Sequence, residues 1–334
     1  ELESNKIETQ NLEKQQSINN KNYFLINSLD EIDKWIEEAE EVGEVAVDTE
    51  TTSLDPHQAD LVGISLCSKI GKACYIPVGH KSPKCLKKEA VIKKLKKILE
   101  DPSIKKIGQN IKFDFIVFYK NGITLSSMED TMLMSYVLDA GKNRHNMDTL
   151  SEIHLGHKTI SFKEIVGTGK KEINFSEVEL DKAKDYAAED VDVTFRLYKK
   201  FVKNLKSEKM INIYEIFEKP LIKILAFMEI EGVEIDSKFL KSLSSKFEKK
   251  IQKLEKEVFK ISKKEFNIAS PKQLGEIIYN DLKIAGLKKT KKGSFATSAS
   301  VLEDLAFKGH EFSKLILDWR QVSKLKNTYF RCFT

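Results

Sequence analysis

The sequence predicts a mixed α/β domain followed by an all-helical segment. Three short apolar runs separated by turn residues, at residues 43–51, 60–70 and 73–79, are typical of strands. Helix and strand patterns then alternate, which indicates a mixed β-sheet with flanking helices. After about residue 205 no strand pattern follows, and residues 237–265 have a long helical period. A chain of 334 residues is long enough for two domains.

Local patterns support each element in turn. EIDKWIEEAEEV, residues 31–42, predicts an amphipathic helix that ends near Gly43. KKEAVIKKLKKILED, residues 87–101, predicts a helix with a lysine-rich outer face, and KKIGQN, residues 105–110, predicts a fourth strand. The long helix of the second domain has an apolar stripe narrow enough to pack against a partner helix. Its members recur at spacings of three and four: Leu240, Leu243, Phe247, Ile251, Leu254, Val258 and Ile261.

Composition excludes several classes of protein. No apolar run approaches the roughly 18 residues of a membrane span. The polar first twenty residues lack the centre of a signal peptide and predict a disordered arm or linker over residues 1–21. The cysteines show neither zinc-site nor disulfide spacing: Cys67, Cys74, Cys85 and Cys332. We therefore expect a cytoplasmic monomer that does not bind membranes.

Charge and chain ends add two expectations. Residues 1–200 hold 29 basic and 34 acidic groups, whereas residues 201–334 hold 27 and 17. The basic excess of the second part favours a polyanionic partner, with solvated helix faces as an equal alternative. The chain begins with Glu and ends at NTYFRCFT without a closing element, so we expect a piece of a larger protein.

Two acids interrupt the first predicted strand. Asp48 and Glu50 in VAVDTETTSL are two residues apart, so on a strand they project to the same side while Thr49 faces away. A buried acid is costly unless it is paired or binds a metal ion. Two neighbouring carboxylates suit hard cations such as Mg²⁺. An isolated Asp-x-Glu sequence, however, is more often a pair of exposed acids at the end of a strand.

Two further segments supply companions for these acids. IGQNIKFDF places Asn110 and Asp114 four residues apart at the start of a helix, and YAAEDVDVT places Tyr186 and Asp190 four residues apart in an Ala-rich helix. The three segments could therefore converge on one site.

These segments carry a resemblance. DTETTSL, GQNIKFD and YAAEDVDVT resemble the three motifs of the DEDDy class of proofreading 3′→5′ exonucleases. Residues 129–165, from EDTMLMSYVL to KTISFKEI, add a closer likeness to the exonuclease domain of bacterial DNA polymerase I, a family A polymerase. Residues 210–329 are similar to the opening, thumb-forming part of the polymerase domain in the same family. The resemblance implies an RNase H-like exonuclease over residues 22–206 and a truncated, all-α partial thumb over residues 207–334.

Site residues follow from the resemblance position by position. The implied metal ligands are Asp48, Glu50, Asp114 and Asp190, and Tyr186 would orient the attacking water. Leu54 and Phe162 resemble the apolar residues that hold the terminal base, with core packing as the alternative. Asn110 and Arg144 resemble contacts to the frayed strand, with a helix cap and a surface charge as the alternatives. In the thumb, four positions resemble contacts to primer-template DNA: Asn267, Ser270, Arg320 and Lys324.

The implied chemistry is phosphodiester hydrolysis with two divalent cations, Mg²⁺ or Mn²⁺, about 4 Å apart. The substrate would be a single-stranded or frayed 3′ end of DNA, and a mismatched end would enter more easily because it frays. The palm aspartates and the nucleotide-binding helix of the family have no counterpart after Tyr329. We therefore expect no polymerase active site in this chain, within a protein of DNA replication and repair.

Two alternatives remain open at this point. The chain could be a catalytically inert DNA-binding fragment, since some relatives keep this fold without the acids. An RNA-trimming exonuclease of the RNase D type would share the same five site residues, although the thumb-like segment argues against it.

Overall fold

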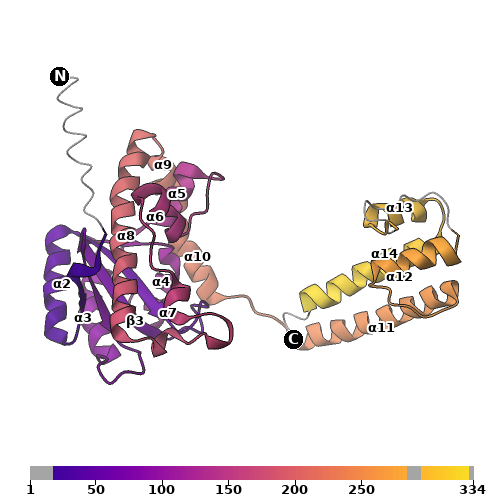
Figure 1. Ribbon diagram of the computed structural model, residues 1–334, viewed down its shortest axis with the longest axis horizontal. Coiled ribbons are helices and arrows are strands. Elements are labelled where there is room, and N and C mark those ends of the chain that lie inside the picture. The colour runs from indigo at the N-terminus through magenta and orange to yellow at the C-terminus, as the bar shows by residue number, and fades with distance from the viewer. Residues whose placement is uncertain (1–17, 284–294, 331–334) are drawn as a thin grey trace. The chain divides into compact units, whose positions relative to one another are not determined.

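The computed structural model describes residues 18–283 and 295–330, and one six-stranded sheet lies in the first part (Figure 1). Its strands are β1 (Tyr23–Leu25), β2 (Glu44–Thr51), β3 (Leu61–Lys69), β4 (Lys72–Pro77), β5 (Lys105–Gly108) and β6 (Met128–Asp130). The strand order is β1-β4-β3-β2-β5-β6, with β2 antiparallel to β3 and parallel to β5. The predicted mixed sheet is therefore confirmed, whereas most of the predicted N-terminal arm, residues 1–17, lies outside the described residues.

Helices flank the sheet and form most of the other regular structure in the described chain. Those before Gly232 are α2 (Leu29–Val42), α3 (Lys88–Glu100), α4 (Ile111–Lys120), α5 (Thr131–Asp139), α6 (Met147–Leu155), α7 (Phe162–Val166), α8 (Leu180–Ser207), α9 (Ile211–Ile213) and α10 (Lys219–Glu231). Those after it are α11 (Ser237–Ser262), α12 (Pro271–Glu276), α13 (Ala299–Phe307) and α14 (Glu311–Lys324). Short 3₁₀ or π segments are η1 (Asn20–Asn22), η2 (Gly169–Lys171), η3 (Phe175–Glu177), η4 (Tyr214–Glu218), η5 (Ile277–Asp281) and η6 (Leu325–Phe330).

Alternation along β2 divides its side chains between two cores. Val45 and Val47 pack in a core with residues of α2, α3 and α4, whereas Ala46 packs in a core with residues of α8. This division follows from the two-residue period of a strand. Helix α8 contacts β1 through β5 and runs alongside the sheet in Figure 1. Strand β2 is thus covered on both faces by helices.

A buried polar cluster ties α8 to the sheet. The Asp192 carboxylate accepts hydrogen bonds from the Tyr23 hydroxyl at 2.9 Å and from the Gly71 N–H at 2.8 Å. It also accepts a hydrogen bond at 3.0 Å from Nε of Arg196, one helical turn away. Both members of this ion pair are buried. Asp192 therefore links α8 to β1 and to the β3–β4 turn.

Two compact units divide after Gly232, later than the boundary at residues 206 and 207 that the sequence predicts. The intervening segment packs with the first unit because α10 contacts α4. Phe227 of α10 meets Phe115 and Tyr119 of α4 edge-on, with ring centroids 5.5 Å apart in both pairs. Residues up to α10 therefore belong structurally to the sheet-containing unit.

The second unit consists of helices in its described residues, as expected. Ile251 and Leu254 of α11 pack against Val322 of α14, and the Trp319 indole N–H donates a hydrogen bond to Glu255 at 3.0 Å. The predicted apolar stripe thus packs against a partner helix. Within the described ranges, the helices are all too short or too polar to cross a membrane.

Replacing Asp192 by Ala should lower the free energy of unfolding of the first unit by about 3 to 5 kcal/mol. This is the range for removing one partner of a buried ion pair. Urea denaturation followed by circular dichroism would measure it. Asp33→Ala provides the control, because Asp33 is 51% exposed beside Lys94 and its loss should cost about 1 kcal/mol or less. Equal losses in the two variants would contradict the structural role of Asp192.

Candidate active site

Strand β2 and helix α8 bring three carboxylates together. Asp48 and Glu50 lie two residues apart on β2, on the face that carries Ala46 toward α8. Asp190 lies in α8, and one oxygen from each of these three side chains lies within 4.8 Å of the others. Tyr186 precedes Asp190 by one helical turn, and the charge of Asp190 acts on its hydroxyl. The predicted convergence of the first and third segments is therefore observed.

Asp114 lies beside this group and is held by the residue between the two β2 acids. Thr49 donates to Asp114 Oδ1 from its backbone N–H at 2.9 Å and from its hydroxyl at 2.6 Å. The sequence predicted only that Thr49 would face away from Asp48 and Glu50. Because β2 alternates, Thr49 lies on the side of Val47, which packs with α4, the helix of Asp114.

A cavity of about 640 Å³ opens over these groups. All five predicted catalytic residues line it, together with Leu54, Asn110 and Phe162. Leu54 is 92% exposed and Phe162 is 43% exposed, so neither is a core residue. Phe162 stacks on the buried ring of Phe175 with centroids 6.1 Å apart and an interplanar angle of 7°. The cavity thus combines acids with exposed apolar side chains.

The two predicted strand contacts differ in their placement. Asn110 occupies the N-cap position of α4 in the left-handed conformation, with φ at 63°, and its side chain makes no capping hydrogen bond within the described chain. Arg144 is exposed and is absent from the cavity lining formed by the described residues.

The predicted thumb contacts lie in the second unit, and three of them have local partners. Ser270 caps α12 by accepting the Gln273 N–H at 3.4 Å, and the Asn267 side chain accepts the Ala269 N–H at 3.0 Å. Arg320 donates to the Thr297 carbonyl at 2.7 Å. Lys324 is exposed on α14.

Burial dominates the electrostatics of the acid cluster. It raises the pKa of Asp48 to about 6. Burial, followed by the charge of Asp48, raises the pKa values of Glu50, Asp114 and Asp190 well above their usual range. Such an arrangement is costly for ionised carboxylates unless a cation compensates them.

These groups fit a divalent metal ion. Oδ1 of Asp190 is buried and has no hydrogen-bond partner among the described residues, although buried oxygens are usually paired. Oxygen ligands from carboxylates are those that Mg²⁺ and Mn²⁺ prefer. Asp48, Glu50 and Asp190 could hold such an ion directly, and Asp114 lies close enough for its charge to act on Glu50.

Three residues around the site were not predicted from the sequence. Thr49 donates a hydrogen bond to Asp114. Phe175 packs against the rings of Phe162 and Tyr186, and its ring centroid lies 6.0 Å from that of Tyr186. Asp130 accepts backbone N–H groups at the starts of α4 and α5. Only Asp130 had a readable signal, an acid directly before a helical pattern.

Replacing Thr49 by Val should weaken Mn²⁺ binding roughly tenfold or more. The change removes a hydrogen bond to a charged group, worth about 1.5 to 3 kcal/mol, while keeping the side-chain shape. Calorimetric titration with Mn²⁺ would measure it. Thr49→Ser keeps the hydroxyl and should stay within about twofold of the parent chain. Equal affinities for the Val and Ser variants would contradict the role of Thr49.

Metal-free protein should lose stability as the pH rises. The folded pKa of Asp48, about 6, exceeds its ordinary value of 3.8, so the folded state holds more protons than the unfolded state in that window. Asp48→Asn should therefore stabilise the metal-free chain at pH 7.5 by on the order of 3 kcal/mol and change little at pH 4. Urea denaturation in chelator at both pH values would measure this. A gain of equal size at both pH values would contradict it.

Comparison with known proteins places these features in a family. Residues 23–206 match the family described as 3′-5′ exonuclease, and residues 237–334 match the family described as DNA polymerase family A. The fold resembles that of the POL domain of Pol1 from M. smegmatis, solved in complex with DNA primer-template and dNTP. The TM-score is 0.73 at 23% identity, covering 91% of this chain and 49% of that chain.

Curated relatives agree with this assignment. The chain is 43% identical to DNA polymerase I of Rhizobium leguminosarum over 328 residues, covering 92% of this chain and 32% of the relative. It is 40% identical to DNA polymerase I of Pseudomonas aeruginosa over 305 residues, covering 89% and 33%. The chain thus spans about one third of the length of these relatives. Its acid cluster, its sheet and these matches lead to one conclusion: the chain belongs to the bacterial DNA polymerase I family, with a 3′-5′ exonuclease domain followed by a family A polymerase region.

Proposed function

We propose that the chain removes nucleotides one at a time from the 3′ end of single-stranded or frayed DNA, as a metal-dependent proofreading exonuclease. The observation that carries the proposal is the group of Asp48, Glu50 and Asp190, whose oxygens converge within 4.8 Å inside a domain of the 3′-5′ exonuclease family. DNA as the substrate is supported by the DNA polymerase I relatives and by the primer-template bound to the M. smegmatis protein.

The acids would hold two divalent cations, Mg²⁺ or Mn²⁺, with Asp114 as the fourth carboxylate. Bound in this way, such ions lower the pKa of a water molecule and stabilise charge on the phosphate and the leaving 3′ oxygen. Tyr186 remains protonated, because burial and the neighbouring charge of Asp190 raise its pKa. Its hydroxyl can therefore orient the attacking water by a hydrogen bond.

Leu54 and Phe162 would hold the terminal base. Both expose apolar surface to the cavity that the acids line, and Phe162 is fixed in place by stacking on Phe175. Stacking on apolar and aromatic side chains tolerates every base, so we expect weak sequence preference. A mismatched end needs less energy to unpair, and this difference would favour its removal.

The predicted strand contacts lie in the first unit and the predicted thumb contacts in the second, and each group would bind DNA within its own unit. Asn110 is exposed at the cavity and could donate to a phosphate or a sugar. Arg144 and Lys324 have exposed, positively charged side chains, and each could bind a phosphate. Hydrogen-bond donors at Asn267, Ser270 and Arg320 could also contact phosphates.

The purified chain should shorten a 5′-labelled, 3′-mismatched primer-template stepwise in Mg²⁺ and not in chelator. Asp190→Asn should slow this more than roughly 100-fold, because even partners of metal ligands contribute about 10- to 100-fold. Glu41→Gln is the control, since Glu41 is 75% exposed outside the cavity and the change should leave the rate intact. Product lengths on a denaturing gel would measure both.

Three outcomes would overturn the proposal. Folded parent chain that binds the primer-template without shortening it in Mg²⁺ or Mn²⁺ would indicate an inert DNA-binding fragment. Faster digestion of RNA than of a matched DNA strand would indicate an RNA-trimming enzyme. Full activity of Asp190→Asn would exclude the acid cluster as the site.

A further inference from the structure

Asp130 replaces the missing capping side chain of α4. It lies at the end of β6, is 1% exposed, and accepts the N–H groups of Asn110 at 3.2 Å and Ile111 at 2.9 Å. The same carboxylate accepts the N–H groups of Met132 and Leu133 at the start of α5. Because the first N–H groups of a helix have no partner within the helix, this contact anchors the start of α4.

The anchored turn carries a site residue. Asp114 lies in the first turn of α4, three residues after Ile111. The start of α4 also packs tightly on β5, since a Cβ added to Gly108 would lie 2.8 Å from Cβ of Ile111. A shift of Asp130 would therefore be passed to the turn that positions Asp114.

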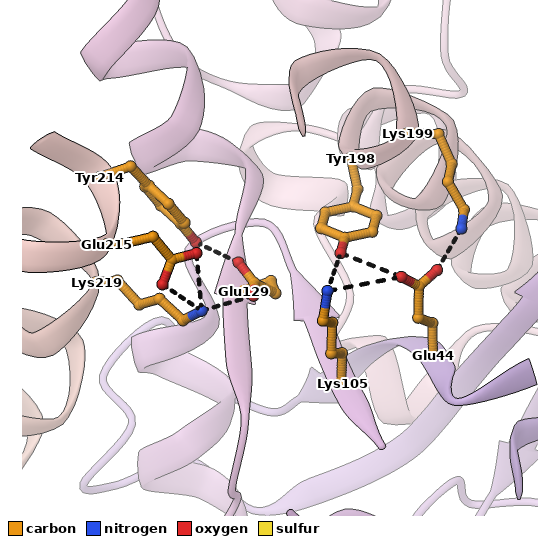
Figure 2. Close-up of polar contacts among 8 residues, drawn as sticks. All are labelled: Glu44, Lys105, Glu129, Tyr198, Lys199, Tyr214, Glu215 and Lys219. Atoms are coloured by element: carbon orange, nitrogen blue, oxygen red, sulfur yellow. Dashed lines mark hydrogen bonds and ion pairs between the residues drawn. The ribbon is translucent and has the colours of Figure 1, made fainter. Parts of the chain in front are cut away.

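Tyr214 in turn fixes Asp130. Strand β6 is an edge strand, paired only with β5 within the described sheet. The Asp130 N–H donates to the Tyr214 hydroxyl at 2.9 Å, and this hydroxyl donates to Glu129 at 3.0 Å. Lys219 donates to the other oxygen of Glu129 at 2.6 Å, as Figure 2 shows. Tyr214 is fully buried and Glu129 is 4% exposed, so the contact is shielded from water.

We propose that Tyr214 is a positioning residue for Asp114, acting through Asp130 and the first turn of α4. The proposal rests on the proposed function, which makes Asp114 a metal ligand. Tyr214 and Lys219 lie outside the matched exonuclease region, residues 23–206, and before the matched polymerase region, which begins at residue 237. The connecting segment thus supports the metal site of the domain that precedes it.

A second tyrosine offers a matched control. The hydroxyl of Tyr198 lies 3.3 Å from both Glu44 and Lys105, and Lys199 pairs with the same glutamate (Figure 2). Tyr198 is 2% exposed, so Phe replaces it at similar burial. Within the described chain its hydroxyl contacts these two side chains, and neither of them caps a helix. Loss of the Tyr198 hydroxyl should affect stability without changing the metal site.

Tyr214→Phe and Tyr198→Phe would be compared in the full chain. We expect Tyr214→Phe to weaken Mn²⁺ binding roughly five- to tenfold, the size of one buried hydrogen bond, and to lower kcat with the KM for DNA unchanged. Tyr198→Phe should stay within about twofold of the parent chain in both Mn²⁺ affinity and kcat. In an Asp114→Asn background, Tyr214→Phe should weaken Mn²⁺ binding by less than about a further twofold, because Tyr214 acts on the metal site through Asp114. Calorimetric titration with Mn²⁺ and steady-state digestion at fixed Mg²⁺ would measure these effects.

The outcomes separate this inference from the function on which it rests. A parent chain that digests DNA while Tyr214→Phe and Tyr198→Phe bind Mn²⁺ equally would overturn the role of Tyr214 alone. A loss in Tyr214→Phe that persists undiminished beside Asp114→Asn would do the same. A folded parent chain that neither binds Mn²⁺ nor digests DNA would overturn both proposals. If the circular dichroism spectrum shows that Tyr214→Phe is unfolded, Glu129→Gln is measured in its place, and it should likewise weaken Mn²⁺ binding and lower kcat.

Discussion

The alternation of side chains along β2 is the constraint on which the site depends. Asp48 and Glu50 lie on the face covered by α8, where Asp190 and Tyr186 are found, while Thr49 reaches Asp114 on α4. Side chains of this one strand therefore reach both helices that complete the site, α4 and α8. A shift of one residue in its register would exchange the two faces and separate the acids from Asp190.

Two aspartates in α8, Asp190 and Asp192, are both buried but differ in their hydrogen-bond partners. Asp192 is fully buried, and both of its oxygens have partners, from Tyr23, Gly71 and Arg196. Asp190, two residues earlier, keeps a buried oxygen without a partner within the described chain. The first acid is thus satisfied within the chain, whereas the second keeps an oxygen that a cation would satisfy in the proposed function.

Much of the fold could be predicted because its elements have strong local patterns. Helix α2 ends before Gly43, and the apolar runs of β2, β3 and β4 form strands, as the sequence indicates. Strands β1 and β6 were missed because each has three residues and is defined by pairing with a distant strand. The role of Thr49 and the contact from Tyr214 to Asp130 were not predictable, since both depend on tertiary packing between segments far apart in the chain.

The continuity of α8 has a consequence for how substrate could enter. Tyr186 and Asp190 lie one turn apart in an unbroken helix of 28 residues that contacts five strands. Because this helix packs across the sheet, the two side chains are positioned by the same core that positions Asp48 and Glu50 on β2. At the rim of the cavity, Leu54 lies in a bend and is 92% exposed, whereas Phe162 begins a helix of five residues and stacks on Phe175. In the proposed function, adjustment to bases of different size would therefore fall to Leu54, while the acids and the Phe162 ring keep their positions.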